Sequence, residues 1–314
     1  MNRNALSLVE LMIEQAGKLR IRVSKSMNGA TLLDLGLEVE GGFLAGKYTT
    51  EVCIGGLGSA SLITTSYGDL HLPAIFVATD HPAVALLGSQ CAGWRVRVGD
   101  YEAMGSGPAR ALALKPKRFY SLIGYGDDSE VAVIVLEASE MPGSGVVDYI
   151  CGECGVDPEG LYVLVAPTTS VAGSVQVSGR VAEVGLHRLV ELGFDPKRVL
   201  CGCGCAPVAP VHPSPEMAMG RANDMIAYGG VAHFSVDYED DEGLERVVRG
   251  APSSVSRDYG RPFFEVFEEA GRDFYKVDSA IFAPAVLTVN NVRTGSFFKA
   301  GRLDAHLLKQ SLSS

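Results

Sequence analysis

The sequence has no excess of positive charge. Its 314 residues include 27 lysines and arginines against 37 aspartates and glutamates, for a formal net charge of −10. Binding to nucleic acid or to an anionic membrane through overall charge needs the opposite balance. We therefore expect no nucleic-acid partner and no membrane partner, and any anionic ligand must be met by a local basic pocket.

The sequence also lacks long apolar runs. No run approaches the roughly 20 residues that a membrane-spanning helix needs. The stretch NALSLVELMIEQAGKLRI is interrupted by Glu10 and Glu14, which is typical of an amphipathic helix and not of a signal peptide. Seven cysteines are an odd number in a long chain, which indicates reduced thiols. We expect a cytoplasmic protein.

Apolar residues make up 47% of the chain, enough for a sizeable core, and the length suggests two domains. The segments EVAVIVLEA (130–138) and LYVLVAP (161–167) predict buried strands within a region of alternating helical and strand patterns. Before residue 72, one helix followed by short strands and turns is predicted, and a hairpin is predicted to turn between residues 290 and 295. The fold class is mixed α and β (α+β or α/β).

A weak internal echo joins ECGVDPEGLYVLVAP to ELGFDPKRVLCGCGCAP. Both segments predict a helix end, a Gly-x-Asp-Pro turn, a strand and an Ala-Pro loop, because glycine ends a helix and proline prevents its continuation. The loop at 166–174 would then follow the carboxyl end of a strand, where ligands commonly bind.

Two cysteine motifs suggest metal or redox chemistry. In CGCGC (201–205), alternate thiols of a strand lie roughly 6.6 Å apart, whereas two zinc ligands approach to roughly 3.8 Å. Close-packed strand residues are therefore the favoured interpretation over a metal site. CGEC (151–154) has the spacing of a redox pair, but it lies at a predicted helix C-terminus, where the helix dipole disfavours a thiolate.

Two glycine-rich segments raise the question of phosphate binding. GGLGSAS (55–61) precedes a β-branched run and not a helix, so we predict strand–turn–strand and no nicotinamide site. In MGSGPARALALKPK (104–117), Ser106 is predicted to cap a helix, whose start would offer N–H groups to an anion, with Arg110 close by. An ordinary capped helix explains the same pattern. Asp80 can likewise be interpreted either as the cap of the next helix or as a residue that binds substrate.

The stretch GSVQVSGRVAEVG (173–185) holds an arginine and a glutamate three residues apart. On one helix, Gln176, Arg180, Glu183 and His187 share a polar face. A solvent-exposed ion pair worth under ~1 kcal/mol is one interpretation. A catalytic carboxylate oriented by an arginine is the other.

Several motifs together resemble the methenyltetrahydromethanopterin cyclohydrolase family: TDHPAVALLGSQCAGWRVRVGDYEAMGSGPARALALKPK, APTTSVAGSVQVSGRVAEVG, AMGRANDMIAYGG and FYKVDSAIFAPAVLTVNNVRTG. The resemblance runs from about residue 5 to residue 308. It implies a two-domain subunit with the substrate pocket between the domains, which we divide into residues 1–80 plus 275–314 and residues 81–274. It also implies a homotrimer that works without a metal or redox cofactor.

The resemblance implies that Glu183 and Arg180 catalyse the interconversion of N5,N10-methenyltetrahydromethanopterin and N5-formyltetrahydromethanopterin. We expect further residues to bind this pterin substrate: Asp80, Gly105, Ser106, Gly107, Arg110, Thr168, Ser174 and Gln176. Two alternatives remain. One is a non-catalytic binding module for a phosphorylated pterin-like metabolite, and the other is an iron–sulfur or zinc protein that uses Cys201, Cys203 and Cys205.

Overall fold

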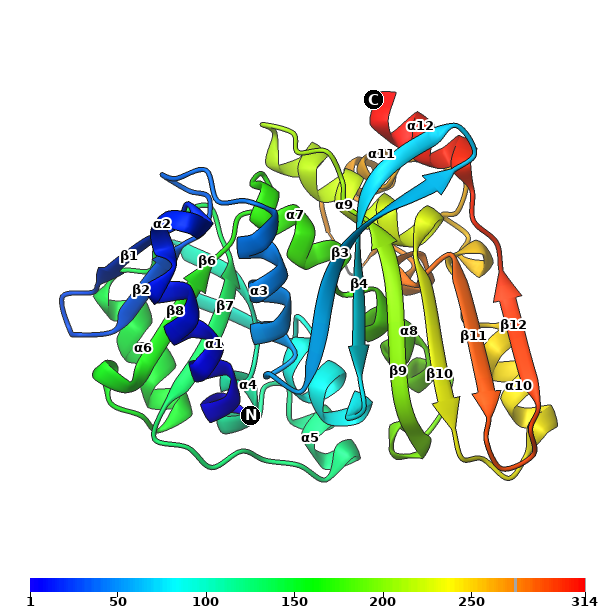
Figure 1. Ribbon diagram of the computed structural model, residues 1–314, viewed down its shortest axis with the longest axis horizontal. Helices are drawn as coiled ribbons and strands as arrows, with labels where there is room; N and C mark the ends of the chain where they lie inside the picture. The colour runs from blue at the N-terminus through cyan, green and yellow to red at the C-terminus, as the bar shows by residue number, and fades with distance from the viewer. Residues whose placement is uncertain (274–275, 314) are drawn as a thin grey trace. The chain divides into compact units, whose positions relative to one another are not determined.

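The computed structural model describes residues 1–273 and 276–313 (Figure 1). It contains two six-stranded sheets, each with parallel and antiparallel pairs, together with helices, so the predicted mixed α and β class is confirmed. The chain divides into two compact units, residues 1–59 with 83–176 and residues 60–82 with 177–314. Among the described residues, no helix combines the length and the apolar character that crossing a bilayer requires.

The sheet of the first unit has the strand order β1-β2-β8-β7-β6-β5. Its central strands β2, β8 and β7 run parallel, and the outer pairs are antiparallel. The strands predicted from EVAVIVLEA and LYVLVAP are confirmed as β7 and β8. The bounds are β1 Arg22–Lys25, β2 Thr31–Asp34, β5 Trp94–Val98, β6 Tyr101–Ser106, β7 Ala132–Glu137 and β8 Leu161–Val165.

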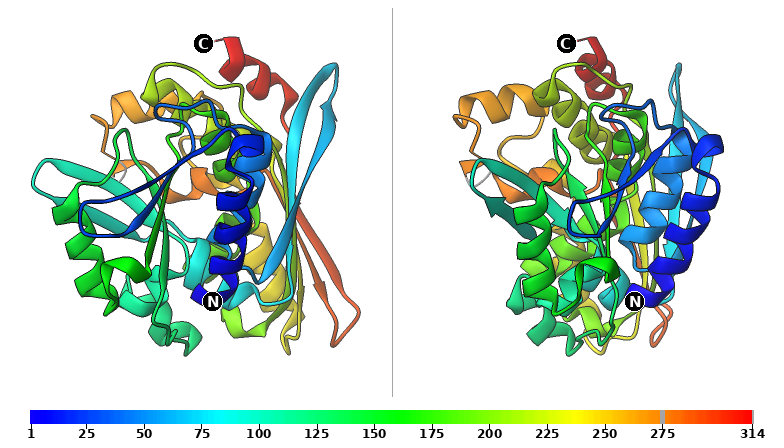
Figure 2. Two further views of the ribbon diagram at one scale, coloured as in Figure 1. Left: turned by 60° about the vertical axis from the view of Figure 1, so that its left-hand side comes forward. Right: turned by 90° about the vertical axis from the view of Figure 1, so that its left-hand side faces the viewer.

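Helices cover both faces of this sheet because its central strands are apolar on both sides. The helices α1 (Asn2–Glu14) and α3 (Phe43–Cys53) lie side by side and pack on the face that carries Val133 and Val135 (Figure 2). The helix α6 (Ser144–Cys154) packs on the opposite face, against Ile134 and Leu136. The other helices are α2 Ala16–Leu19, the π-helix η1 Ala83–Gln90, α4 Ala109–Ala113, α5 Lys117–Ile123, η2 Pro158–Gly160 and α7 Val171–Ser178.

The sheet of the second unit has the order β12-β11-β10-β9-β4-β3. In this sheet β10 and β11 are parallel neighbours. The antiparallel strands β11 and β12 form the hairpin predicted near residues 290–295. The strands are β3 Gly58–Tyr67, β4 Leu70–Thr79, β9 Val199–Pro207, β10 Val231–Val236, β11 Val286–Asn291 and β12 Phe297–Gly301. The helices are α8 Val181–Glu191, η3 Pro196–Arg198, α9 Pro215–Gly229, α10 Asp241–Arg249, η4 Ser253–Val255, α11 Phe263–Glu269, η6 Ser279–Phe282 and α12 Ala305–Ser313.

Both halves of the internal echo fold as predicted up to their strands, but the second Ala-Pro pair is the end of β9 and not a loop. Gly155 follows α6 directly and Gly193 follows α8 after Leu192, and they take positive φ angles of 69° and 92°, which few other residues adopt without strain. Each Asp-Pro then begins a 3₁₀ turn, η2 or η3, that leads into β8 or β9. The repeated sequence therefore marks two helix-to-strand connections.

The prediction of strand–turn–strand around residues 55–61 is wrong in its first part, because α3 precedes the turn. The segment FLAGKYTTEVC contains β-branched and glycine residues, which weaken the helical signal. Packing explains the helix: a Cβ on Gly46 would lie 2.5 Å from the Val175 Cβ, so only glycine lets α3 approach α7.

The two compact units differ from the predicted domain division. The hairpin of β3 and β4 belongs to the sheet of the second unit, where β4 pairs with β9. The first unit resumes at residue 83 and reaches residue 176, so the division falls within α7. The other predicted boundary, between residues 274 and 275, lies outside the described residues.

Asp224 of α9 is a buried carboxyl group that joins three helices of the second unit. It is 1% exposed, and it accepts hydrogen bonds from the Phe263 backbone N–H (2.9 Å) and the Ser311 hydroxyl (2.6 Å). Burial raises its pKa to about 7. The folded protein therefore keeps a proton here at pH values where the unfolded chain has lost it.

We expect this proton to make stability depend on pH. Because the folded-state pKa lies above the unfolded one, the contribution is complete below about pH 4 and is lost as the pH rises to about 7. A tenfold difference in proton affinity between the two states corresponds to about 1.4 kcal/mol. In Asp224→Asn the amide oxygen can accept from the Phe263 N–H and the NH₂ group can donate to the Ser311 oxygen without a charge, so denaturant unfolding should show a smaller loss of stability in the variant between about pH 4 and about pH 7. Parallel pH profiles for the two proteins would contradict the assignment.

Candidate active site

Arg180 and Glu183 lie at the start of α8, after a break in the helical path. The predicted continuous helix is wrong here, since α7 ends at Ser178 and α8 begins at Val181. The Arg180 N–H donates to the Val177 carbonyl (3.0 Å), and the Arg180 carbonyl accepts from the Val184 N–H (2.9 Å). Arg180 is thus the residue before the helix, and Glu183 is in the first turn, where the helix dipole favours a carboxylate.

Both side chains are buried. Arg180 is 8% exposed, Glu183 is 3% exposed, and Gln176 is buried as well, whereas His187 is half-buried. The interpretation as a solvent-exposed ion pair is therefore wrong. Burying an arginine and a glutamate so close in sequence costs free energy unless they have polar partners, a cost that active sites often carry.

The glycines of CGCGC make room for this helix. A Cβ on Gly204 would lie 2.8 Å from Val181 Cγ1 and 3.1 Å from the Ala182 nitrogen. A Cβ on Gly202 would lie 2.7 Å from the ring of Phe234, against which Gly185 of α8 also packs. Alternate residues of a strand face opposite ways. The glycines therefore face α8 and the cysteines face the other side of the sheet.

The cysteine thiols lack the features of reactive or metal-binding groups. Burial raises the pKa of Cys203 and Cys205, and it raises the pKa of Cys151 to about 11 and that of Cys154 to about 12. Nothing in these sites favours the reactive thiolate. Within residues 1–273 and 276–313, no three His, Cys, Asp or Glu side chains are grouped so that they could hold a metal ion.

The helix that we predicted to start near Gly105–Gly107 begins later in the chain. Gly105 and Ser106 are the last residues of β6, and α4 begins only at Ala109 and has five residues. Ser106 does not cap it, since the hydroxyl approaches the Val135 carbonyl at 3.5 Å. The Gly107 N–H donates to the Ser89 carbonyl (2.9 Å). Strand pairing of Ser106 with Val135 overrides the local capping signal.

Arg110 is fully buried in the first unit. Its guanidinium donates to the carbonyls of Leu87 (3.2 Å), Ser89 (3.0 Å) and Lys115 (2.8 Å). The first two carbonyls end the π-helix η1, so the cation satisfies acceptors at a negative helix end. Of the guanidinium nitrogens of Arg110, Nη2 is buried without a hydrogen-bond acceptor among the described residues. This geometry gives Arg110 a structural role.

The remaining predicted binding residues fall into two groups. Thr168, Ser174 and Gln176 are buried in and before α7, and the Thr168 hydroxyl donates to the carboxylate of Glu137. Asp80 is exposed after β4, in the second unit. Sequence reasoning missed Glu137, although a charged residue that ends a long apolar strand is a signal that could have pointed to it.

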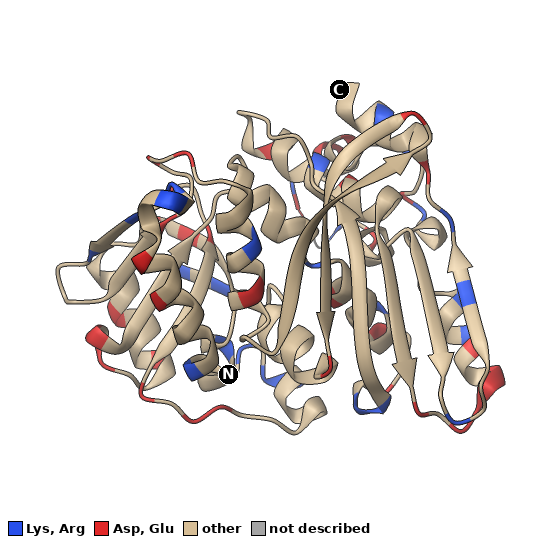
Figure 3. Cartoon of the chain, in the orientation of Figure 1, with Lys and Arg blue, Asp and Glu red and all other residues tan. Residues whose placement is uncertain are grey.

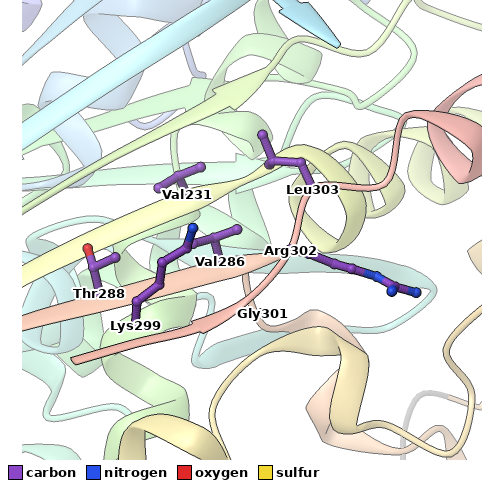
Figure 4. Close-up of a pocket in the computed structure, with 7 residues that line it drawn as sticks. All are labelled: Val231, Val286, Thr288, Lys299, Gly301, Arg302 and Leu303. Atoms are coloured by element: carbon purple, nitrogen blue, oxygen red, sulfur yellow. The ribbon is translucent and has the colours of Figure 1, made fainter. Parts of the chain in front are cut away.

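A cavity of about 430 Å³ lies on the second sheet, on the face opposite α8 (Figure 4). Its lining comes from β10, β11, β12 and the segment that follows: Val231, Val286, Thr288, Lys299, Gly301, Arg302 and Leu303. The Lys299 side chain turns toward Val231 and Val286, while the Arg302 side chain extends away from the group. None of the predicted site residues lines this cavity.

Comparison with known proteins identifies the family. The family described as Cyclohydrolase (MCH) matches residues 1–312. The methenyltetrahydromethanopterin cyclohydrolase of Methanocaldococcus jannaschii is 47% identical over 99% of this chain and 97% of its own. The chain belongs to the methenyltetrahydromethanopterin cyclohydrolase family. It is accordingly a hydrolase.

Further relatives with the same description show similar identity. The protein of Methanothermobacter marburgensis is 46% identical, covering 99% of this chain and 98% of its own length. That of Methanococcoides burtonii is 44% identical, with coverages of 99% and 97%. The predicted resemblance is therefore confirmed over essentially the whole chain.

Proposed function

We propose that the enzyme interconverts N5,N10-methenyltetrahydromethanopterin and N5-formyltetrahydromethanopterin, with Glu183 as general base and acid and Arg180 as its positioning residue. The observation that carries the assignment is the buried Arg180 and Glu183 at the start of α8 in a chain that belongs to this family. Mixing the purified protein with methenyltetrahydromethanopterin and following the loss of its near-ultraviolet absorbance tests the activity. No loss of absorbance would exclude it.

The reaction needs one proton acceptor and one proton donor in sequence. The methenyl bridge is a resonance-stabilised cation between two nitrogens, and water attacks its carbon. The water loses a proton to the base as the C–O bond forms, which gives a tetrahedral intermediate. The C–N10 bond then breaks as N10 takes up that proton. The hydroxyl oxygen becomes the formyl carbonyl as its own proton leaves to solvent, so hydrolysis of the cation releases one proton overall. One carboxylate can accept the proton from the water and donate it to N10, with about 10²–10⁴-fold acceleration.

Glu183 fits this role because its buried carboxyl group lies in the first turn of α8, next in the chain to the Arg180 segment. The N–H groups of that turn point toward the helix start. Arg180 would orient Glu183 and could stabilise the oxygen that becomes the formyl group.

We propose that no metal takes part. The support is chemical: the bridging carbon is already an electron-poor cation, so water attacks it without a Lewis acid. The substrate-binding roles of Asp80, Gly105, Ser106, Gly107, Arg110, Thr168, Ser174 and Gln176 stay predictions. So do the pocket between the domains and the cytoplasmic location.

We propose that the active particle is a homotrimer and that the sheet face opposite α8 takes part in its assembly. Phe76 is 36% exposed, Phe297 61% and Leu303 45%. Along β9, β10 and β11 this sheet has no charged residue (Figure 3). Exposed apolar patches of this kind mark association sites. Light scattering should give three times the mass of one chain, and the mass of a single chain would contradict the proposal.

A further inference from the structure

The first sheet has a topological switch point at the carboxyl ends of β7 and β8. These strands are parallel neighbours. The chain leaves β7 toward α6, which packs on one face, and leaves β8 toward α7, whose Ala172 packs on the other face. In open α/β sheets, ligands commonly bind beyond the carboxyl ends of two neighbouring strands whose following connections pass to opposite faces of the sheet.

Glu137 and Thr168 lie together at the carboxyl ends of β7 and β8. Glu137 is the last residue of β7 and is half-buried, and Thr168 follows β8 and is 8% exposed. The Thr168 hydroxyl donates to Glu137 Oε1, which links the ends of the two strands. A carboxylate has about four acceptor positions, so one hydroxyl leaves most of its capacity for a ligand.

The loop that carries Thr168 is held firmly. The Ser170 hydroxyl donates to the Pro167 carbonyl (2.8 Å), and the same oxygen accepts from the Gly173 N–H (3.0 Å) as the cap of α7. A Cβ on Gly173 would lie 1.9 Å from the Pro167 carbonyl oxygen, so this position admits only glycine. The hydroxyl that orients Glu137 therefore comes from a rigid segment, as precise ligand recognition requires.

Asp34, at the end of the neighbouring strand β2, is a carboxylate whose acceptor positions are used within the protein. Its carboxylate accepts from the backbone N–H groups of Gly36, Leu37 and Glu38, at 2.7–2.9 Å, so it stabilises a turn. Glu137 does not stabilise a turn in this way: within residues 1–273 and 276–313, no lysine or arginine forms an ion pair with it and no backbone N–H donates to it. A half-buried carboxylate with a single hydroxyl partner is suited to accept ligand donors.

We propose that Glu137, oriented by Thr168, binds the amino-pyrimidinone edge of the pterin ring and so selects ligands that carry this edge. This inference rests on the proposed function. That edge presents a ring N–H and an exocyclic amino group side by side. Two parallel donors match the two oxygens of a carboxylate, as in arginine–carboxylate pairs. The contact is the same in the ground state and the transition state, so its loss raises KM and leaves kcat.

The test is the kinetics of Glu137→Gln with methenyltetrahydromethanopterin. The amide keeps the shape but turns an N–H₂ group toward the ligand donors, so we expect KM to rise about tenfold or more while kcat stays within about threefold. Thr168→Val should raise KM less, because it only frees the carboxylate. Glu140→Gln, at an exposed glutamate three residues along, is the matched control and should change neither constant.

A substrate analogue without the exocyclic amino group supplies an independent readout. It should bind the wild type more weakly than the natural pterin does, and Glu137→Gln should lower its affinity far less than that of the natural pterin. An unchanged KM in Glu137→Gln, or equal losses for both ligands, would overturn the inference. If Glu137→Gln fails to fold, Glu137→Asp with the same two ligands decides. Inactivity of the wild type would instead reject the proposed function.

Discussion

Glu183→Gln is expected to lower kcat by at least ~100-fold while substrate binding survives. The amide preserves the shape and one acceptor oxygen of the buried side chain, but it takes up no proton near neutral pH. The proton from the attacking water then has no acceptor, and N10 has no donor. Steady-state kinetics with methenyltetrahydromethanopterin, together with a binding measurement, would separate the two effects.

Related variants sharpen this prediction. Glu183→Asp should keep part of the activity, because the base is present but drawn back by one methylene. Arg180→Ala should also slow turnover. Combining it with Glu183→Gln should cost less than the product of the single effects, as residues that act together do.

The same helix supplies a matched control. Arg188 and Glu191 are also three apart on α8 and form an ion pair at 3.1 Å, with side chains 16% and 31% exposed. Glu191→Gln should leave kcat within about twofold, since surface pairs contribute little. Wild-type turnover by folded Glu183→Gln would remove this glutamate from the mechanism.

Arg110→Ala is expected to destabilise the first unit by about 3–5 kcal/mol, because truncation leaves a cavity and three carbonyls without their donor. Arg110→Lys should recover only part of this loss, since an ammonium group does not reproduce the geometry of the guanidinium fork. Thermal and denaturant unfolding measure both effects.

Lys117→Ala is the control for this substitution, because Lys117 is exposed at the start of α5. It should change stability by under about 0.5 kcal/mol. The sequence alone predicts that Arg110 contacts an anionic group of the substrate. In that role, its loss would weaken substrate binding and leave stability unchanged. A variant that unfolds like the wild type and shows only a raised KM would establish binding by Arg110 and contradict the structural role.

Patterns within short segments identified much of the fold correctly. The apolar runs that became β7 and β8, the two Gly-x-Asp-Pro connections and the hairpin of β11 and β12 all depend on neighbouring residues. The helix α3 was missed for the converse reason. Its residues favour other structures, and its packing through Gly46 against α7, far along the chain, decides the outcome.

The candidate site divides in the same way. The spacing of Arg180 and Glu183 is visible in the sequence, whereas their burial depends on how β9 lies against α8, through Gly204 and Val181. The sequence of CGCGC suggested cysteine chemistry or tight packing, and only the strand's orientation showed that the glycines carry the packing.

The sequence by itself determined the family, the class of mixed α and β structure and the elements whose signals lie within about ten residues. Tertiary structure alone decided which polar groups meet. Glu137 and Thr168 are 31 residues apart, and they bond because β7 and β8 are parallel neighbours. Arg110 meets the end of η1 more than twenty positions earlier in the chain. Local propensities act over a few residues, whereas strand order and helix packing bring distant residues together, and hydrogen bonds form only where groups are in contact.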